Sequence, residues 1–139
     1  MTPDAARPHV AVLGLGAMGL PMATRLAGAF TITGYDPLPA SREKAEQTGI
    51  RCAASATGAV ADAGIVLLAV RDAAQVESVL FGEHGVAAAL APGAVVLMTS
   101  TVGVDAVASW TARLTEQGMA VVDAPPCPVA LCEPATATC

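Results

Sequence analysis

Three glycines in this chain have the spacing of a phosphate-binding turn. Gly14, Gly16 and Gly19 form the pattern Gly-x-Gly-x-x-Gly directly after an apolar run at residues 10–13. In such a turn the first glycine permits a tight bend, the second lets the main chain approach a pyrophosphate, and the third lets the next helix pack closely on the sheet. That helix also presents free N–H groups and a positive partial charge at its N-terminus. The pattern predicts a dinucleotide-binding turn.

An acidic residue follows at the distance that such a site requires. Asp36 ends a second apolar run, residues 31–35, and lies about 20 residues beyond the turn, where a carboxylate can accept a hydrogen bond from an adenosine ribose. A glycine-rich turn that binds nothing and an S-adenosylmethionine site are the alternatives. The third glycine and the helix N-terminus favour a dinucleotide.

Short apolar runs alternate with helical patterns from residue 10 to residue 123. We expect strands at residues 10–13, 31–35, 50–53, 65–70, 94–98 and 119–123, and helices at 18–28, 40–48, 55–61, 72–82, 86–90 and 104–117. This alternation requires parallel pairing with right-handed crossovers. The fold class is therefore α/β, with a doubly wound, mostly parallel sheet in a single domain and a ligand crevice at the carboxyl ends of the strands.

Composition excludes several other classes of function. The chain has 139 residues and a net charge of −5, with only seven Lys and Arg residues. The absence of a basic stripe argues against a nucleic-acid partner. Glycine and proline interrupt both long charge-free stretches, whereas a membrane span needs about 20 apolar residues in a row. Four cysteines and two histidines without a Cys-x-x-Cys pair predict no metal site. We expect a cytoplasmic protein with no membrane or nucleic-acid partner.

Several segments together resemble a known family. Residues 14–23 (Gly-Leu-Gly-Ala-Met-Gly-Leu-Pro-Met-Ala), Tyr35-Asp36, Ser100-Thr101-Val102 and Asp123-Ala124-Pro125 resemble the 3-hydroxyacid dehydrogenase family, which includes 3-hydroxyisobutyrate dehydrogenases and is related to 6-phosphogluconate dehydrogenase. The resemblance covers residues 10–125. It implies a Rossmann domain that binds NAD or NADP for hydride transfer with a small 3-hydroxy acid. Imine reductases share the glycine turn and the Ser-Thr pair, and they remain an alternative.

The resemblance also implies which residues bind the cofactor. The cofactor-binding residues are Gly14, Leu15, Gly16, Ala17, Met18 and Gly19 at the pyrophosphate, Asp36, Val70 and Arg71 at the riboses, and Thr101 near the nicotinamide. Asp36 favours NAD, because its carboxylate would repel the 2′-phosphate of NADP and Pro37 stands where an arginine could hold that phosphate. Arg42 lies close enough in sequence to keep NADP as an alternative.

The sequence after Pro125 departs from the family pattern. Family members continue with a Ser-Gly-Gly substrate loop, whereas residues 126–139 contain three cysteines and show no helical or strand period. If the codons are read one nucleotide earlier from Pro126, they permit Leu-Ser-Gly-Gly and further family-like residues. We therefore expect residues 1–125 to form the NAD(P)-binding domain, and residues 126–139 to be an aberrant, frameshifted and disordered tail.

This departure bears on catalysis. The resemblance implies that a catalytic lysine and the contacts of a homo-oligomer belong to a second, helical domain. The single lysine of this chain, Lys44, falls on the second expected helix, away from the nicotinamide end. We therefore assign no catalytic residue and expect a truncated, catalytically incomplete cofactor-binding half. The alternative is a stand-alone dinucleotide-binding or redox-sensing module.

Overall fold

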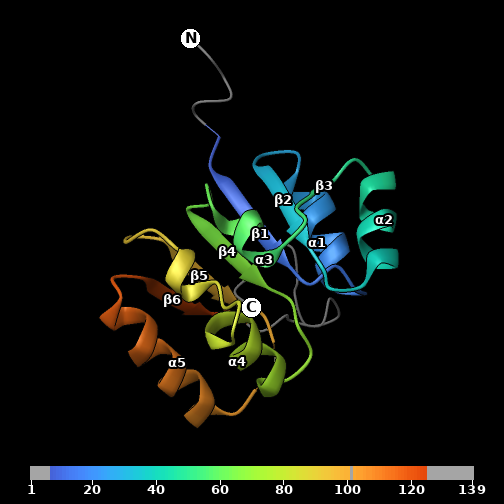
Figure 1. Cartoon of the computed structure of the whole chain (residues 1–139). Helices are drawn as coiled ribbons and strands as arrows, with labels where there is room; N and C mark the ends of the chain where they lie inside the picture. The colour runs from blue at the N-terminus through green and yellow to red at the C-terminus, as the bar shows by residue number, and fades with distance from the viewer. Residues whose placement is uncertain (1–6, 101, 125–139) are drawn as a thin grey trace, which may run out of the picture.

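A sheet of parallel strands forms the centre of the structure (Figure 1). The computed structural model describes residues 7–100 and 102–124. Within them the strands are β1 (His9–Leu13), β2 (Thr31–Tyr35), β3 (Arg51–Cys52), β4 (Ile65–Leu68), β5 (Val95–Met98) and β6 (Ala120–Asp123). The helices are α1 (Gly19–Leu26), α2 (Pro39–Gln47), α3 (Ala56–Val60), α4 (Ala73–Phe81), α5 (Val104–Glu116) and a short 3-10 helix, η2 (Ala87–Ala89). The predicted α/β fold is confirmed, and every strand pair in the described sheet is parallel.

The strand order places a crevice at the centre of the sheet. The order is β3-β2-β1-β4-β5-β6, so the chain runs outward from β1 to β3, crosses over to β4 and then runs outward in the other direction. In the register, Leu13 at the end of β1 pairs with Tyr35 of β2 and with Leu68 of β4. The reversal of direction between β1 and β4 is the switch point at which such folds bind their ligands.

Alternation of side chains along the strands produces one core on each face of the sheet. Ala11 and Leu13 of β1 face the helices α3, α4 and α5, whereas Val10 and Val12 face α1 and α2 (Figure 1). All four residues are buried, as expected for a parallel strand covered on both faces. The same alternation continues in β4, so α1 and α4, which flank the crevice, lie on opposite faces of the sheet.

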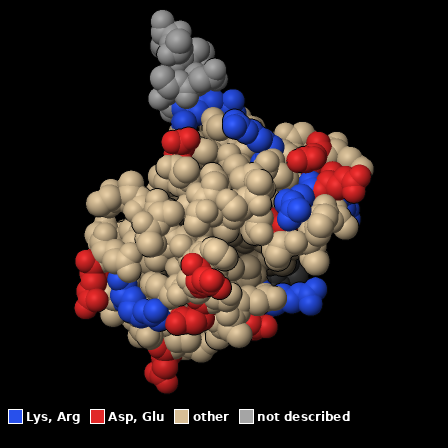
Figure 2. Space-filling view, viewed as in Figure 1, with Lys and Arg blue, Asp and Glu red and all other residues tan. Residues whose placement is uncertain are grey.

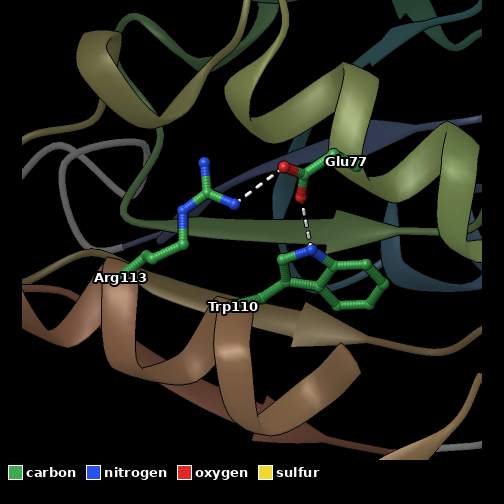
Figure 3. Close-up of polar contacts among 3 residues, drawn as sticks. All are labelled: Glu77, Trp110 and Arg113. Carbon is green, nitrogen blue, oxygen red and sulfur yellow. Dashed lines mark hydrogen bonds and ion pairs between the residues drawn. The ribbon is translucent and has the colours of Figure 1, made fainter. Parts of the chain in front are cut away.

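A polar contact fixes α4 against α5 (Figure 3). The indole Nε1 of Trp110 donates to one carboxylate oxygen of Glu77 at 2.6 Å, and Arg113 donates to the other at 2.7 Å. The guanidinium of Arg113 also lies 3.5 Å from the ring centre of Phe81. Hydrogen bonds from Arg113 and then from Trp110 lower the pKa of Glu77. We call Glu77, Trp110 and Arg113 the α4–α5 clamp.

One expected helix has a tighter form than the others. The short helix expected at residues 86–90 is present as the 3-10 helix η2, not as an α-helix. Gly85 bends back to the carbonyl of Gly82 at 2.9 Å, and Pro92 follows shortly after η2. The space between these two points is too short for an α-helix of ordinary length.

Candidate functional site

A cleft of about 750 Å³ opens at the carboxyl ends of β1, β2, β4 and β5. Its walls come from the glycine turn, the loop after β2, the loop after β4, the first turns of α4 and the end of β5. The lining residues are Leu13, Gly14, Gly16, Ala17, Met18, Tyr35, Asp36, Pro37, Leu38, Ser41, Ala56, Ala69, Val70, Arg71, Gln75, Ser78, Val79, Thr99 and Ser100. The cleft therefore lies at the position that the strand order predicts.

The three glycines of the turn are required for different reasons. Gly14 has φ of +102°, and a Cβ on it would overlap the carbonyl of Ala69. A Cβ on Gly19 would overlap the carbonyl oxygen of Gly14. At Gly16, by contrast, an added Cβ would meet no atom of the described residues within 4 Å. The packing of the described residues thus explains two of the glycines, whereas Gly16 borders free space in the cleft.

Three consecutive main-chain N–H groups, beginning with that of Gly16, lie at the turn. The N–H groups of Gly16, Ala17 and Met18 form no hydrogen bond to another main-chain group in the described part of the chain. The carbonyls of Gly16 and Met18 accept hydrogen bonds from Leu20 and Met22 as α1 begins. Donors in this position, at the positive end of a helix, suit a phosphate or another anion.

The carboxylate of Asp36 connects two loops of the cleft. One oxygen accepts the N–H of Leu15 at 2.9 Å, and the other accepts the N–H of Leu38 at 2.8 Å. Asp36 is 8% exposed. Because a carboxylate offers about four acceptor positions, it can still accept from a ribose hydroxyl. The side chain is therefore held at the cleft wall with acceptor capacity remaining.

Arg42 lies beside this carboxylate. Its guanidinium donates to the main-chain oxygen of Asp36 at 2.6 Å and lies 5.8 Å from the ring centre of Tyr35. Arg42 is half-buried, and it is held by a carbonyl and an aromatic ring rather than by a carboxylate. Among the described residues, the ion pair is formed by Arg113 and Glu77, at 2.7 Å, and does not involve Arg42.

At the end of β5, two side-chain hydroxyl groups form hydrogen bonds to the main chain that follows β4. Thr99 donates from its hydroxyl to the carbonyl of Leu68 at 2.7 Å, and Ser100 donates to the carbonyl of Val70. These bonds join the end of β5 to the end of β4 across the sheet. They position the main chain just before residue 101.

The expected cofactor-binding residues fall into three groups. Gly14, Gly16, Ala17, Met18, Asp36, Val70 and Arg71 line the cleft. Leu15 and Gly19 do not line it. The side chain of Leu15 is buried in the core, and Gly19 packs against the carbonyl of Gly14 within the turn. Thr101 and the expected tail, residues 126–139, lie outside the described residues.

Sequence reasoning missed the wall formed by α4. Gln75, Ser78 and Val79 line the cleft, and Gln75 accepts the N–H of Arg71 at 2.7 Å through its side chain. Asp72 caps the start of α4, because its side chain accepts the N–H of Gln75 at 2.9 Å. The signal was available: α4 begins at the carboxyl end of β4, so its first turns must face the crevice.

Other kinds of site have little support in the described residues. Residues 7–100 and 102–124 contain no group of three His, Cys, Asp or Glu side chains arranged to hold a metal ion. Over the same ranges, no helix has both the length and the apolar character needed to cross a bilayer. Burial raises the pKa of the Cys52 thiol, which lies outside the cleft lining. On the face drawn in Figure 2, basic and acidic side chains are interspersed.

Comparison with known proteins finds similar sequences over most of this chain. The sequence model described as the NAD binding domain of 6-phosphogluconate dehydrogenase matches residues 9–127. L-threonate dehydrogenase from Pectobacterium atrosepticum is 41% identical over 118 residues, which is 84% of this chain and 39% of that protein. The NAD-dependent L-serine dehydrogenase of Pseudomonas aeruginosa is 33% identical over 118 residues, or 84% of this chain and 40% of its own length.

A solved structure extends the likeness to the fold. The 3-hydroxyisobutyrate dehydrogenase of Mycobacterium tuberculosis, determined with L-serine, superposes with a TM-score of 0.82 at 32% sequence identity. The match covers 88% of this chain and 41% of that one. The chain thus spans about 40% of the length of the relatives described here.

Proposed function

This chain belongs to the family of the NAD-binding domain of 6-phosphogluconate dehydrogenase, and from that membership we propose that it is the cofactor-binding part of an NAD-dependent dehydrogenase of small 3-hydroxy acids. The observation that carries the proposal is the free space at Gly16 beside free main-chain donors. A turn that served only to join β1 to α1 would not need a glycine there.

We propose a specific role for each part of the cleft. The N–H groups of Gly16, Ala17 and Met18 bind the pyrophosphate, and the N-terminus of α1 adds its positive partial charge. Asp36 accepts a hydroxyl of the adenosine ribose. The nicotinamide extends toward the end of β5, where Ser100 is held. When bound, NAD supplies the hydride acceptor, and the protein supplies position and orientation.

NAD is the preferred cofactor in this proposal. The charge of Asp36 lies at the adenosine end, where a 2′-phosphate would be repelled. Arg42, the nearest cation to that loop in sequence, is already bonded to the main-chain oxygen of Asp36. The name of the L-serine dehydrogenase relative, which specifies NAD, supports the same preference.

The substrate class is proposed from the relatives. L-threonate, L-serine and 3-hydroxyisobutyrate, which their names give, are all small carboxylic acids with a hydroxyl on carbon 3. Lys44 lies exposed on α2 and outside the cleft lining, so it is no candidate for proton transfer to such a substrate. We propose that the catalytic lysine and the substrate pocket belong to a helical domain that this chain needs for turnover.

The expected tail has its own proposal. We infer that residues 126–139 are translated from a shifted reading frame, because their composition changes abruptly after Pro125 and the alternative frame permits a family-like loop. Sequencing of the gene through this point tests the inference. Codons that spell Leu-Ser-Gly-Gly in the other frame would support it, and codons that do not would overturn it.

Titration of the chain with NADH tests the proposed function directly. We expect saturable binding at one site, with weaker binding of NADPH. A folded chain that shows no saturable binding of NADH would contradict the proposal.

A further inference from the structure

Two side chains hold the loop that follows β4. From the end of β5, the hydroxyl of Ser100 donates to the carbonyl of Val70. From the first turn of α4, the side-chain oxygen of Gln75 accepts the N–H of Arg71 at 2.7 Å. We infer that Gln75 is a positioning residue, which strengthens cofactor binding through this loop and not through a contact of its own with the ligand. The inference rests on the proposed function, because NADH binding is its readout.

The loop depends on these side chains because main-chain hydrogen bonds do not extend along it. Main-chain bonding to β1 ends at Ala69, whose N–H donates to the carbonyl of Leu13 at 2.9 Å. In the described part of the chain, Val70 and Arg71 form no hydrogen bond to another main-chain group. The direction of the loop is therefore set by the side chains that contact it from β5 and α4.

The position of the loop matters because it touches the glycine turn. The carbonyl oxygen of Ala69 occupies the space that a Cβ on Gly14 would need. Gly14, Val70 and Arg71 line the same cleft. A shift of the loop would thus change the spacing between the wall after β4 and the turn that is proposed to bind the pyrophosphate. A ligand that contacts both walls would lose contacts.

The side chain of Gln75 is not needed to cap its own helix. Its main-chain N–H donates to the carboxylate of Asp72 at 2.9 Å, which caps the start of α4. Val76, the next residue, is fully buried and packs this turn of α4 against the core. The Gln75 side chain therefore extends from a fixed base, past the cap, to the N–H of Arg71.

An amide oxygen suits this position better than a carboxylate. Glutamine supplies an acceptor that carries no charge, whereas glutamate would supply the same acceptor with a negative charge. Because Gln75 lines the cleft, such a charge would repel the phosphates of a dinucleotide. Glutamine holds the loop without this repulsion.

Two other roles for Gln75 make different predictions. If it only stabilised the start of α4, its loss would lower the free energy of unfolding and leave the NADH affinity of the folded chain unchanged. If its amide group contacted the cofactor directly, its loss would weaken binding by the same factor with or without the Ser100 hydroxyl. If Gln75 and Ser100 act through one loop, the effects of their loss on NADH affinity do not simply multiply.

The test is a double-mutant cycle of NADH affinities, measured by isothermal titration calorimetry on the wild-type chain, Gln75→Leu, Ser100→Ala and the double variant. We expect Gln75→Leu to weaken NADH binding about fivefold, as the loss of one net hydrogen bond predicts. The change in the double variant should differ from the product of the two single changes by at least about threefold, which corresponds to a pair of coupled residues.

Two further variants sharpen the cycle. Gln75→Glu keeps the acceptor, so at about 0.5 M salt, where its charge is screened, it should bind NADH more tightly than Gln75→Leu. Gln47→Leu is the matched control, since Gln47 is exposed on α2 and lies outside the cleft lining. It should leave NADH affinity unchanged.

The outcomes separate the inference from the proposed function. Equal NADH affinity in the wild-type chain and in Gln75→Leu would overturn the inference, as would single changes that multiply in the double variant. If Gln75→Leu does not fold, hydrogen exchange of the wild-type chain decides: the N–H of Arg71 should exchange more slowly than that of Ala17, and equal rates would overturn the inference. A wild-type chain that binds no NADH would instead overturn the proposed function, and the inference with it.

Discussion

The carboxylate of Asp36 accepts a hydrogen bond from the main-chain N–H of Leu15 at 2.9 Å, although 21 positions separate the two residues in the sequence. Through this bond the loop after β2 holds the glycine turn after β1. A second bond from Leu38 fixes the other carboxylate oxygen. The acid that is proposed to bind the ribose is therefore also a structural link between the two loops that form this end of the cleft.

The double role of Asp36 predicts a loss of stability together with a loss of binding. Asp36→Asn retains one carbonyl acceptor and presents an NH₂ group to the second N–H, so a buried donor loses its partner. We expect the free energy of unfolding to fall by about 1–3 kcal/mol and NADH binding to weaken. Urea unfolding followed by the fluorescence of Trp110, the single tryptophan, measures the first effect. Asp62→Asn, at an exposed position, is the matched control, and an equal loss in that variant would contradict the role of Asp36.

Gly16 predicts a variant that folds but does not bind. A Cβ at this position would meet no atom of residues 7–100 or 102–124 within 4 Å, and the residue does not have a positive φ. Gly16→Ala should therefore leave stability within about 1 kcal/mol of the wild type or raise it slightly. The same methyl group would occupy the space proposed for the pyrophosphate, so NADH affinity should fall at least about tenfold. Unchanged NADH affinity in a folded Gly16→Ala chain would contradict the proposed phosphate position.

Gly19 predicts the opposite result. A Cβ there overlaps the carbonyl oxygen of Gly14, which belongs to the main chain and cannot move without opening the turn. Gly19→Ala should lower the free energy of unfolding by at least about 1–3 kcal/mol. Thermal unfolding monitored by circular dichroism, with Gly16→Ala beside it, gives the comparison. Equal melting temperatures for the two variants would show that the close contact between Gly19 and Gly14 does not constrain the fold.

The α4–α5 clamp predicts a dependence of stability on pH. Hydrogen bonds from Arg113 and Trp110 lower the pKa of Glu77 in the folded chain, so its contribution is fully present above the pKa of an unfolded glutamate, about 4.3. The contribution is lost as the pH falls through the lower folded-state pKa. The difference in urea midpoint between wild type and Glu77→Gln should thus be larger at pH 7 than at pH 3. Glu83→Gln, at an exposed position outside the clamp, should show no such change; a constant difference for Glu77→Gln would contradict the clamp.

The sheet could be predicted from the sequence because its signals are local. Most strands are short apolar runs, with the two-residue β3 (Arg51–Cys52) as the exception, and the alternation with helices favours parallel pairing. The short helix at residues 86–90 was predictable from its alanines, but its 3-10 form was not, because the limits set by Gly85 and Pro92 depend on how the neighbouring turn folds. Local propensity does not reveal that a segment has room for only one turn.

The parts of the candidate site whose positions depend only on the course of the main chain were predictable from the sequence. The glycine turn and Asp36 follow strand ends, so topology brings them to one edge of the sheet. The direction of a side chain after a strand is harder to predict. The side chain of Leu15, a residue expected at the pyrophosphate, is buried in the core, and its N–H group donates to Asp36. The contacts of Arg42 depend on how α2 is oriented, which no local pattern indicates.

We propose above all that this chain binds NAD through the turn at Gly16. Isothermal titration calorimetry of NADH into the wild-type chain and into Gly16→Ala, both shown to be folded by the fluorescence of Trp110, tests it most directly. We predict one saturable site in the wild-type chain, with affinity reduced at least about tenfold in Gly16→Ala. Absence of binding to the folded wild-type chain, or equal affinity in the two proteins, would contradict the claim.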